Sequence, residues 1–141
     1  LLDPRGQRPE AAEARKRVAL AAADLALAAS GTISLELAAA RTPMVIAYQF
    51  NRLTTYVIKK KIKIDTATLV NLLTETRDIP EFLFEACKAQ DISAAVMTLL
   101  NDPAARKRQI ANGDRAMALL GQGSQAPGLR AAKAVLAQIA P

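Results

Sequence analysis

The chain has 141 residues, the size of one domain, and 51% of them are hydrophobic, so it can bury a real core. Its formal net charge of +6 gives a moderate positive field, which suits phosphates, nucleic acid or an anionic membrane surface equally well. Histidine is absent, which excludes histidine-based acid–base catalysis and histidine metal ligands, and the single cysteine, Cys87, cannot form an internal disulfide.

The first 48 residues are predicted to alternate strands and helices. Their order is the end of a strand at residues 1–3, a helix over 9–23, a strand over 24–29, a helix over 32–41 and a strand over 43–48. The strand over 24–29 is assigned because Ser30-Gly31 interrupts an apolar run that propensity alone would allow to continue as a helix. Since that run has no polar face, we expect a buried parallel strand.

The rest of the chain is predicted to be mostly helical. Its order is a basic helix over 52–63, a loop with a short strand over 65–76, an extended segment at 79–81, helices over 91–100 and 103–120, a flexible joint over 121–127 and a final helix over 128–140. We expect Asp91 to cap the first of the two central helices, and Pro103 to begin the second directly after Asp102. No apolar stretch reaches the roughly 20 residues of a membrane span.

Strand–helix alternation followed by terminal helices predicts an α/β fold of three layers. We expect a Rossmann-like parallel sheet with helices on both faces and further helices at the carboxyl terminus. In such sheets, ligands bind beyond the carboxyl ends of the strands. The turns that follow the predicted strands are therefore the first places to look for a site.

The junction at Ser30-Gly31-Thr32 is the first candidate site, because a strand ends there and a helix begins. The first helical turn offers free N–H groups and the positive end of the helix dipole, which suit a phosphate, and Gly31 lets the backbone approach a ligand closely. Glu36 follows Thr32 by four residues, so the two side chains are neighbours on the helix. Its carboxylate is an unpaired acid on a mostly apolar stripe, and it could accept hydrogen bonds from the two hydroxyls of a ribose.

The same residues have a purely structural interpretation. Ser30 or Thr32 could merely cap a helix, and strand–glycine–helix junctions occur throughout α/β proteins, so the local chemistry alone favours capping. An unpaired acid on an apolar stripe favours a binding site instead. Glu36 does not belong to a capping box, because that motif needs a spacing of three residues from the cap.

Several motifs, taken in order, resemble the lipid-A-disaccharide synthases. They are Ala-Ser-Gly-Thr at 29–32 with Leu-Glu-Leu-Ala at 35–38 and Thr-Pro-Met-Val-Ile-Ala-Tyr at 42–48, Leu-Val-Asn-Leu-Leu at 69–73, Ile-Pro-Glu-Phe-Leu at 79–83, and a helix pair that includes 91–95 and 99–103. Their order and spacing hold from about residue 21 to residue 120. The resemblance therefore covers most of the chain and does not depend on one short motif.

The resemblance implies half of a GT-B glycosyltransferase, a fold of two Rossmann-like halves with the active site between them. Residues 1–120 would form the UDP-sugar-binding domain, incomplete at its amino terminus, and residues 121–141 a linker and carboxyl-terminal helix. The whole hexosyltransferase would join UDP-2,3-diacylglucosamine to 2,3-diacylglucosamine 1-phosphate, at the cytoplasmic side of the inner membrane of a Gram-negative bacterium. It would use no cofactor or metal. The general base would lie in a missing amino-terminal domain, so this chain alone would be inactive, and a homodimer stays open.

The resemblance also implies which residues bind the donor. The UDP-sugar site would contain Ser30, Gly31, Thr32, Glu36, Tyr48, Gln49, Asn71 and Glu81. The first three would face the diphosphate, Glu36 would hold the ribose, and Asn71 and Glu81 would lie in or beside the donor cleft. Gln49 stands where relatives usually show a basic residue, which puts one phosphate contact in doubt. Val70, and Thr-Glu-Thr at 74–76, also depart from the usual Pro and Ala-Gly and would reshape a loop.

Residues 52–63 combine dense positive charge with two apolar stripes. One stripe can pack on the sheet, which would leave the other exposed among lysines. A solvated basic face that packs on a neighbouring helix explains this pattern about as well as contact with anionic lipid or a phosphorylated substrate. The residues for such contact would be Arg52, Lys59, Lys60 and Lys61.

Two other classes of function share parts of this pattern. A non-catalytic nucleotide-sugar or phosphate-binding module would have the same pocket without a partner domain. A nucleic-acid-binding domain is suggested by charge alone. We do not expect nucleic acid as a partner, because the basic helix is not interleaved with exposed aromatic residues and no known nucleic-acid-binding motif is present.

Overall fold

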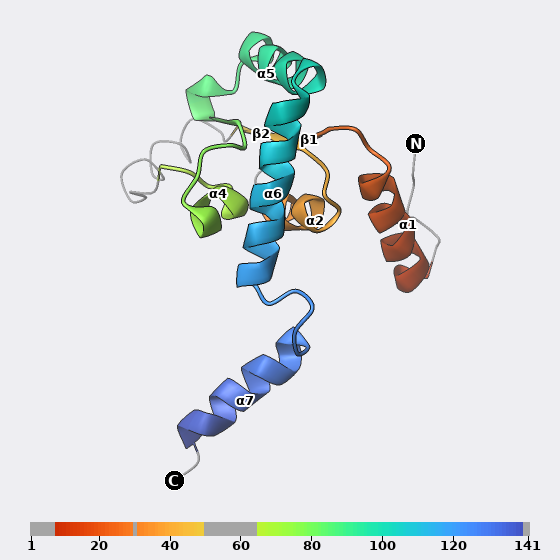
Figure 1. Cartoon of the computed structure of the whole chain (residues 1–141), viewed down its shortest axis with the longest axis vertical. Coiled ribbons are helices and arrows are strands. Elements are labelled where there is room, and N and C mark those ends of the chain that lie inside the picture. The colour runs from red at the N-terminus through yellow and green to blue at the C-terminus, as the bar shows by residue number, and fades with distance from the viewer. Residues whose placement is uncertain (1–7, 30, 50–64, 140–141) are drawn as a thin grey trace.

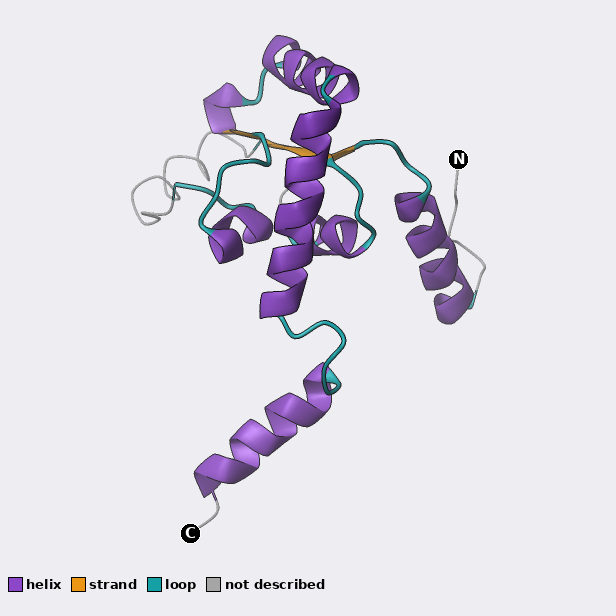
Figure 2. Ribbon diagram, viewed as in Figure 1, coloured by secondary structure: helices purple, strands orange, loops and turns teal. Residues whose placement is uncertain are grey.

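The computed structural model describes residues 8–29, 31–49 and 65–139. Its elements are, in order, α1 (Pro9–Ala21), β1 (Ala26–Ala28), α2 (Ile33–Ala39), β2 (Met44–Tyr48), α4 (Leu69–Thr74), β3 (Glu81–Leu83), the 3-10 helix η1 (Phe84–Ala86), α5 (Ala89–Asn101), α6 (Pro103–Leu119) and α7 (Pro127–Ile139). Figure 1 shows this order, and Figure 2 distinguishes the helices from the strands. The strand predicted at 1–3 and the helix predicted at 52–63 lie outside the described residues.

The strands form a parallel sheet in the order β1-β2-β3, as the sequence predicts. Leu27 of β1 is paired in register with Val45 of β2, and Ala47 of β2 with Phe82 of β3. In Figure 1, α2 and α4 lie on one side of the strands and α5 lies on the other. The predicted α/β fold with helices on both faces of a parallel sheet is therefore confirmed.

The core forms where β2 meets α2, α4 and α6. Ile46 at the centre of the sheet is fully buried and packs with Leu37, Val70 and Ile79. Burial of each such side chain contributes about 1.5–3 kcal/mol to folding. Gly113 lets α6 approach α2 closely, because a Cβ at this position would lie 3.4 Å from the Cβ of Ala38.

The strand predicted at 24–29 forms, but it is only partly buried. Ala26 and Ala28 pack against the core, whereas Leu27 is 58% exposed. The side chains of a strand alternate between the two faces of the sheet, so one face of β1 meets the core and the other faces outward. The parallel strand is therefore confirmed, but the prediction that it is buried was wrong.

The short strand predicted within 65–76 was wrong, because Leu69–Thr74 forms the helix α4, whereas residues 65–68 form a loop as predicted. Thr68 is extended and precedes the helix, and Glu75 ends it in the left-handed region with φ 55°. Val70, Asn71 and Thr74 are buried, which is the spacing of one helix face. A short apolar run does not distinguish a strand from a buried helix by its periodicity.

The two central helices differ in how they begin. Asp102 accepts hydrogen bonds from the backbone N–H groups of Ala104 and Ala105, both at 2.9 Å, and Pro103 begins α6 as predicted. The prediction that Asp91 caps α5 was wrong. Lys88 is the residue that precedes α5, and Asp91 lies within its first turn, where a carboxylate interacts favourably with the helix dipole.

The last helix, α7, extends away from the sheet in Figure 1, and all of its residues are exposed. It is joined to α6 by a short turn segment, across which Arg130 donates a hydrogen bond of 2.6 Å to the carbonyl of Leu120. Within the described ranges, no helix has both the length and the hydrophobicity needed to cross a bilayer.

Candidate functional site

The turn between β1 and α2 is open and depends on glycine. Gly31 has φ +126°, a conformation that side chains rarely adopt, and a Cβ there would meet no atom within 4 Å. Thr32 is exposed, and its side chain makes no capping hydrogen bond to α2. Thr32 is thus the N-cap residue of α2 by position, but its side chain does not supply the capping hydrogen bond. Ser30 lies outside the described residues.

Glu36 is paired, which corrects the prediction of an unpaired acid. Its Oε2 lies 2.8 Å from Nζ of Lys16 in α1, and the same Nζ lies 2.9 Å from Oε2 of Glu13. This Glu36 oxygen is itself buried, and apart from the ion pair no hydrogen bond reaches it from the described residues. The pKa of Lys16 is raised, first by its side-chain hydrogen bond to Glu36 and then by the one to Glu13.

Tyr48 and Gln49 lie at the carboxyl end of β2, and both are exposed. Ala28 at the end of β1 is paired with Ile46 of β2, so the chain leaves both strands at the same edge of the sheet. The fold therefore brings Gly31 and Gln49 to the edge at which parallel sheets bind ligands, although they lie far apart in sequence.

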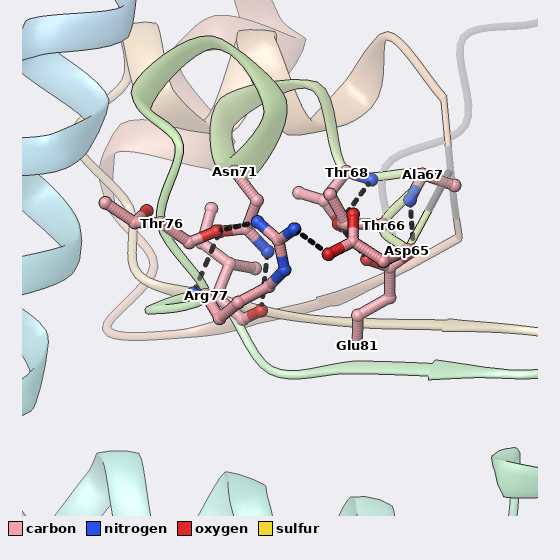
Figure 3. Close-up of polar contacts among 9 residues, drawn as sticks. Asp65, Thr66, Ala67, Thr68, Asn71, Thr76, Arg77 and Glu81 are labelled. Atoms are coloured by element: carbon pink, nitrogen blue, oxygen red, sulfur yellow. Dashed lines mark hydrogen bonds and ion pairs between the residues drawn. The ribbon is translucent and has the colours of Figure 1, made fainter. Parts of the chain in front are cut away.

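Asn71 is 1% exposed and holds the backbone of Ile79 with both ends of its amide. Its Nδ2 donates to the Ile79 carbonyl at 3.0 Å, and its Oδ1 accepts from the Ile79 N–H at 3.2 Å (Figure 3). This contact fixes α4 against the segment that leads into β3. The structure thus gives Asn71 a positioning role.

Glu81, the first residue of β3, holds the segment that precedes α4. Its Oε1 accepts from the backbone N–H of Ala67 at 2.8 Å, and its Oε2 accepts from the hydroxyl of Thr66 (Figure 3). Arg77 makes an ion pair with Asp65 in the same region. Together with Asn71, these contacts join α4 and β3 into one unit, which we call the α4–β3 clamp.

The residues predicted for the donor site thus form two groups. Gly31, Tyr48 and Gln49 lie at the same edge of the sheet, and Glu36 lies on α2, the helix that follows Gly31. Asn71 and Glu81 belong to the α4–β3 clamp. Arg52, Lys59, Lys60 and Lys61 lie outside the described residues.

Sequence reasoning missed three polar residues that the structure makes prominent, namely Lys16, Thr66 and Gln109. Gln109 is 4% exposed and joins the backbone N–H of Met44 to the backbone carbonyl of Asp78, at 2.8 and 2.9 Å. Its signal is a polar residue on the same helix face as Gly113 and Ala116. Lys16 and Thr66 have no comparable local signal, because their partners lie on other elements.

The parallel sheet and the glycine turn at the carboxyl end of β1 define the class of this protein as a parallel α/β domain of Rossmann type. A family profile described as lipid-A-disaccharide synthetase matches residues 10–135. The chain is 56% identical over 140 residues to a lipid-A-disaccharide synthase of Ruegeria pomeroyi, covering 96% of this chain and 33% of the relative. It is also 44% identical over 120 residues to the synthase of Paramagnetospirillum magneticum, covering 84% of this chain and 31% of that protein.

A third relative, the lipid-A-disaccharide synthase of Rhodospirillum centenum, is 42% identical over 124 residues, with 88% of this chain and 31% of that protein covered. The chain therefore belongs to the lipid-A-disaccharide synthase family. It spans about a third of the length of these curated relatives.

Proposed function

We propose that this chain is the donor-binding part of a hexosyltransferase that joins UDP-2,3-diacylglucosamine to 2,3-diacylglucosamine 1-phosphate, giving lipid A disaccharide phosphate and UDP. The observation that carries the proposal is the open glycine turn at Gly31, followed by the Glu36 carboxylate, in a member of this family. An exposed backbone and a carboxylate about one helical turn apart suit the phosphates and the ribose of one nucleotide.

Each part of the site has a separate task in this proposal. Ser30, Gly31 and Thr32 face the diphosphate with backbone N–H groups, and Glu36 accepts hydrogen bonds from the two ribose hydroxyls. Tyr48 and Gln49 border the same edge from β2. Asn71 and Glu81 act through the α4–β3 clamp, which fixes the wall beside the donor.

The remaining parts of the reaction belong to partners of this chain. Transfer breaks the bond between the donor sugar and UDP, and an acceptor hydroxyl must lose its proton to a general base. We propose that an amino-terminal domain supplies this base and binds the acceptor, that the complete enzyme is peripheral to the cytoplasmic side of the inner membrane, and that a homodimer is a state to test.

Calorimetric titration of the complete polypeptide that carries this sequence tests the donor site. Glu36→Ala should weaken UDP binding by at least about tenfold, because each hydrogen bond to a charged group contributes about 1.5–3 kcal/mol. Inorganic pyrophosphate, which has no ribose, should bind to Glu36→Ala with unchanged affinity. The UDP affinity of Glu36→Gln should lie between those of the wild type and Glu36→Ala. Glu10→Ala, an exposed acid on α1, is the control. Equal UDP affinity in all variants, or equal losses for UDP and pyrophosphate, would show that the ribose assignment is wrong.

The membrane part of the proposal concerns Arg52, Lys59, Lys60 and Lys61. If these residues contact anionic lipid, replacing the three lysines with glutamine should weaken vesicle binding by about 1 kcal/mol per charge. A matched control replaces three scattered, exposed lysines, Lys88, Lys107 and Lys133, with glutamine and removes the same charge. Sedimentation with vesicles that contain anionic lipid should separate the two triple variants, and equal binding would contradict the assignment.

A further inference from the structure

Lys16 connects α1 to the acid of the donor site. Its Nζ lies between two carboxylates, 2.8 Å from Glu36 on α2 and 2.9 Å from Glu13 on its own helix. The Lys16 side chain is 42% exposed and that of Glu36 is 37% exposed, although the paired oxygen, Oε2 of Glu36, is itself buried. The two side chains therefore lie partly at the surface. The side-chain hydrogen bonds to Glu36 and then to Glu13 raise the pKa of Lys16.

The position of this contact argues against a role in folding alone. In α1, no described residue is buried, and Glu13 and Lys16 are partly exposed. Ion pairs at such positions add little to stability, because water screens them and two long side chains lose freedom. What the pair does restrict is the Glu36 carboxylate, whose long side chain would otherwise sample several rotamers.

The contact also leaves the carboxylate able to bind more. A carboxylate has about four acceptor sites on its two oxygens, and the Lys16 ion pair reaches Glu36 through Oε2. Within the described residues, that ion pair does not use Oε1, which in the proposed site accepts from the hydroxyl donors. A restrained carboxylate loses less conformational entropy when it accepts them, which strengthens binding without any new contact.

We infer that Lys16 is a positioning residue for nucleotide recognition: it holds the Glu36 carboxylate in the orientation that accepts the ribose hydroxyls, and so determines preference for a ribonucleotide. The inference rests on the proposed donor-binding function. Glu13 supports this role, because its own carboxylate also contacts the Lys16 amine, at 2.9 Å.

The test compares UDP, 2′-deoxy-UDP and inorganic pyrophosphate by titration calorimetry on the complete polypeptide that carries this sequence. Lys16→Met keeps most of the apolar stem and removes the charge. It should weaken UDP binding by about three- to tenfold and reduce the preference for UDP over 2′-deoxy-UDP. It should weaken pyrophosphate binding less than UDP binding, because pyrophosphate loses only the charge balance at Glu36 and has no ribose to lose. Lys16→Arg should restore most of the preference. Arg17→Met, which changes the same charge on the same helix, should match the wild type.

The double variant Lys16→Met/Glu36→Gln separates an indirect effect from a direct one. If Lys16 acts through Glu36, the double variant should bind UDP no more weakly than Glu36→Gln alone, since coupled residues are not additive. Losses that add fully, or a fall in pyrophosphate affinity equal to that for UDP, would overturn the inference, because Lys16 would then act directly on the phosphates or on the fold.

The outcomes distinguish this inference from the proposed function. If the wild type prefers UDP over 2′-deoxy-UDP and Glu36→Gln abolishes that preference while Lys16→Met does not, the donor site stands and the role of Lys16 is wrong. If the wild type shows no such preference, the ribose assignment of Glu36 fails, and the inference about Lys16 fails with it. Urea unfolding of each variant checks that the binding changes do not come from loss of structure.

Discussion

The sharpest structural prediction concerns Asn71, which the family resemblance connects with the donor and the structure connects with the backbone. Asn71→Ala removes two hydrogen bonds to Ile79, at 3.0 and 3.2 Å, and leaves a buried N–H and carbonyl without these partners. A net hydrogen bond contributes about 0.5–1.5 kcal/mol, and an unsatisfied buried group costs about 1–3 kcal/mol. Because water and relaxation recover part of the sum, we expect a loss of about 2–4 kcal/mol.

Such a loss is a large fraction of the 5–15 kcal/mol by which domains are typically stable. The helix α4 has six residues and would not persist without tertiary contacts. Urea unfolding followed by circular dichroism should therefore show a clearly lower midpoint for Asn71→Ala. The matched control is Asn101→Ala on α5, where an exposed amide donates to the carbonyl of Met97 at 2.9 Å. It should change the free energy of unfolding by no more than about 0.5 kcal/mol.

The result that refutes this reasoning is specific. If Asn71→Ala unfolds at the urea concentration of the wild type but binds UDP much more weakly, the amide is a ligand residue and its contact with Ile79 is dispensable. If stability falls as expected and the folded fraction still binds UDP with wild-type affinity, Asn71 acts only through the α4–β3 clamp.

Further predictions concern the packing and capping of α6. Gln109→Leu should lower the free energy of unfolding by about 2–4 kcal/mol, because the buried N–H of Met44 loses its hydrogen-bond acceptor. Gln109→Glu should keep the hydrogen bond from the Met44 N–H. Urea titration measures the stability of both variants. Gly113→Val should cost about 1–3 kcal/mol by overpacking against α2, and Gly113→Ala less, measured in the same way. Hydrogen bonds from the N–H groups of Ala105 and Ala104 lower the pKa of Asp102 in the folded protein. The stability that the Asp102 carboxylate contributes is therefore present above its unfolded pKa and is lost as pH falls below about 4. The thermal unfolding of Asp102→Ala should differ from that of the wild type at about pH 7 and converge with it near about pH 2.

The elements that the sequence predicted well are those with local signals. The strand at Met44–Tyr48 combines β-branched residues with a proline before it, and Asp102 followed by Pro103 combines a cap with a first-turn proline. Both signals act within a few residues. The helix α4 lacked such a signal, because Leu69–Thr74 is a short apolar run whose helical form depends on burial against α6 and α2.

In the candidate site, too, the sequence predicts features that depend on local spacing and misses contacts between separate elements. The position of Glu36 about one turn after Thr32 follows from helix geometry, so the sequence could predict it. The partner of Glu36 could not be predicted in this way, since rules of helical spacing find only partners on the same helix and Lys16 lies on α1. Asn71 and Glu81 show the same limit, because both hold backbone groups that precede or follow them around a turn.

The ion pair with Lys16 also reduces a difficulty in the proposed site. A lone carboxylate beside a diphosphate would repel it, and this repulsion grows as the site excludes water. Lys16, at 2.8 Å, offsets only part of the Glu36 charge, because Glu13 shares the same amine at 2.9 Å. In the proposed site, the contact with Lys16 on the neighbouring helix therefore reduces the repulsion between Glu36 and the diphosphate without removing it. The pairing that the sequence did not predict is therefore compatible with the role that we propose for Glu36, and it makes that role electrostatically easier.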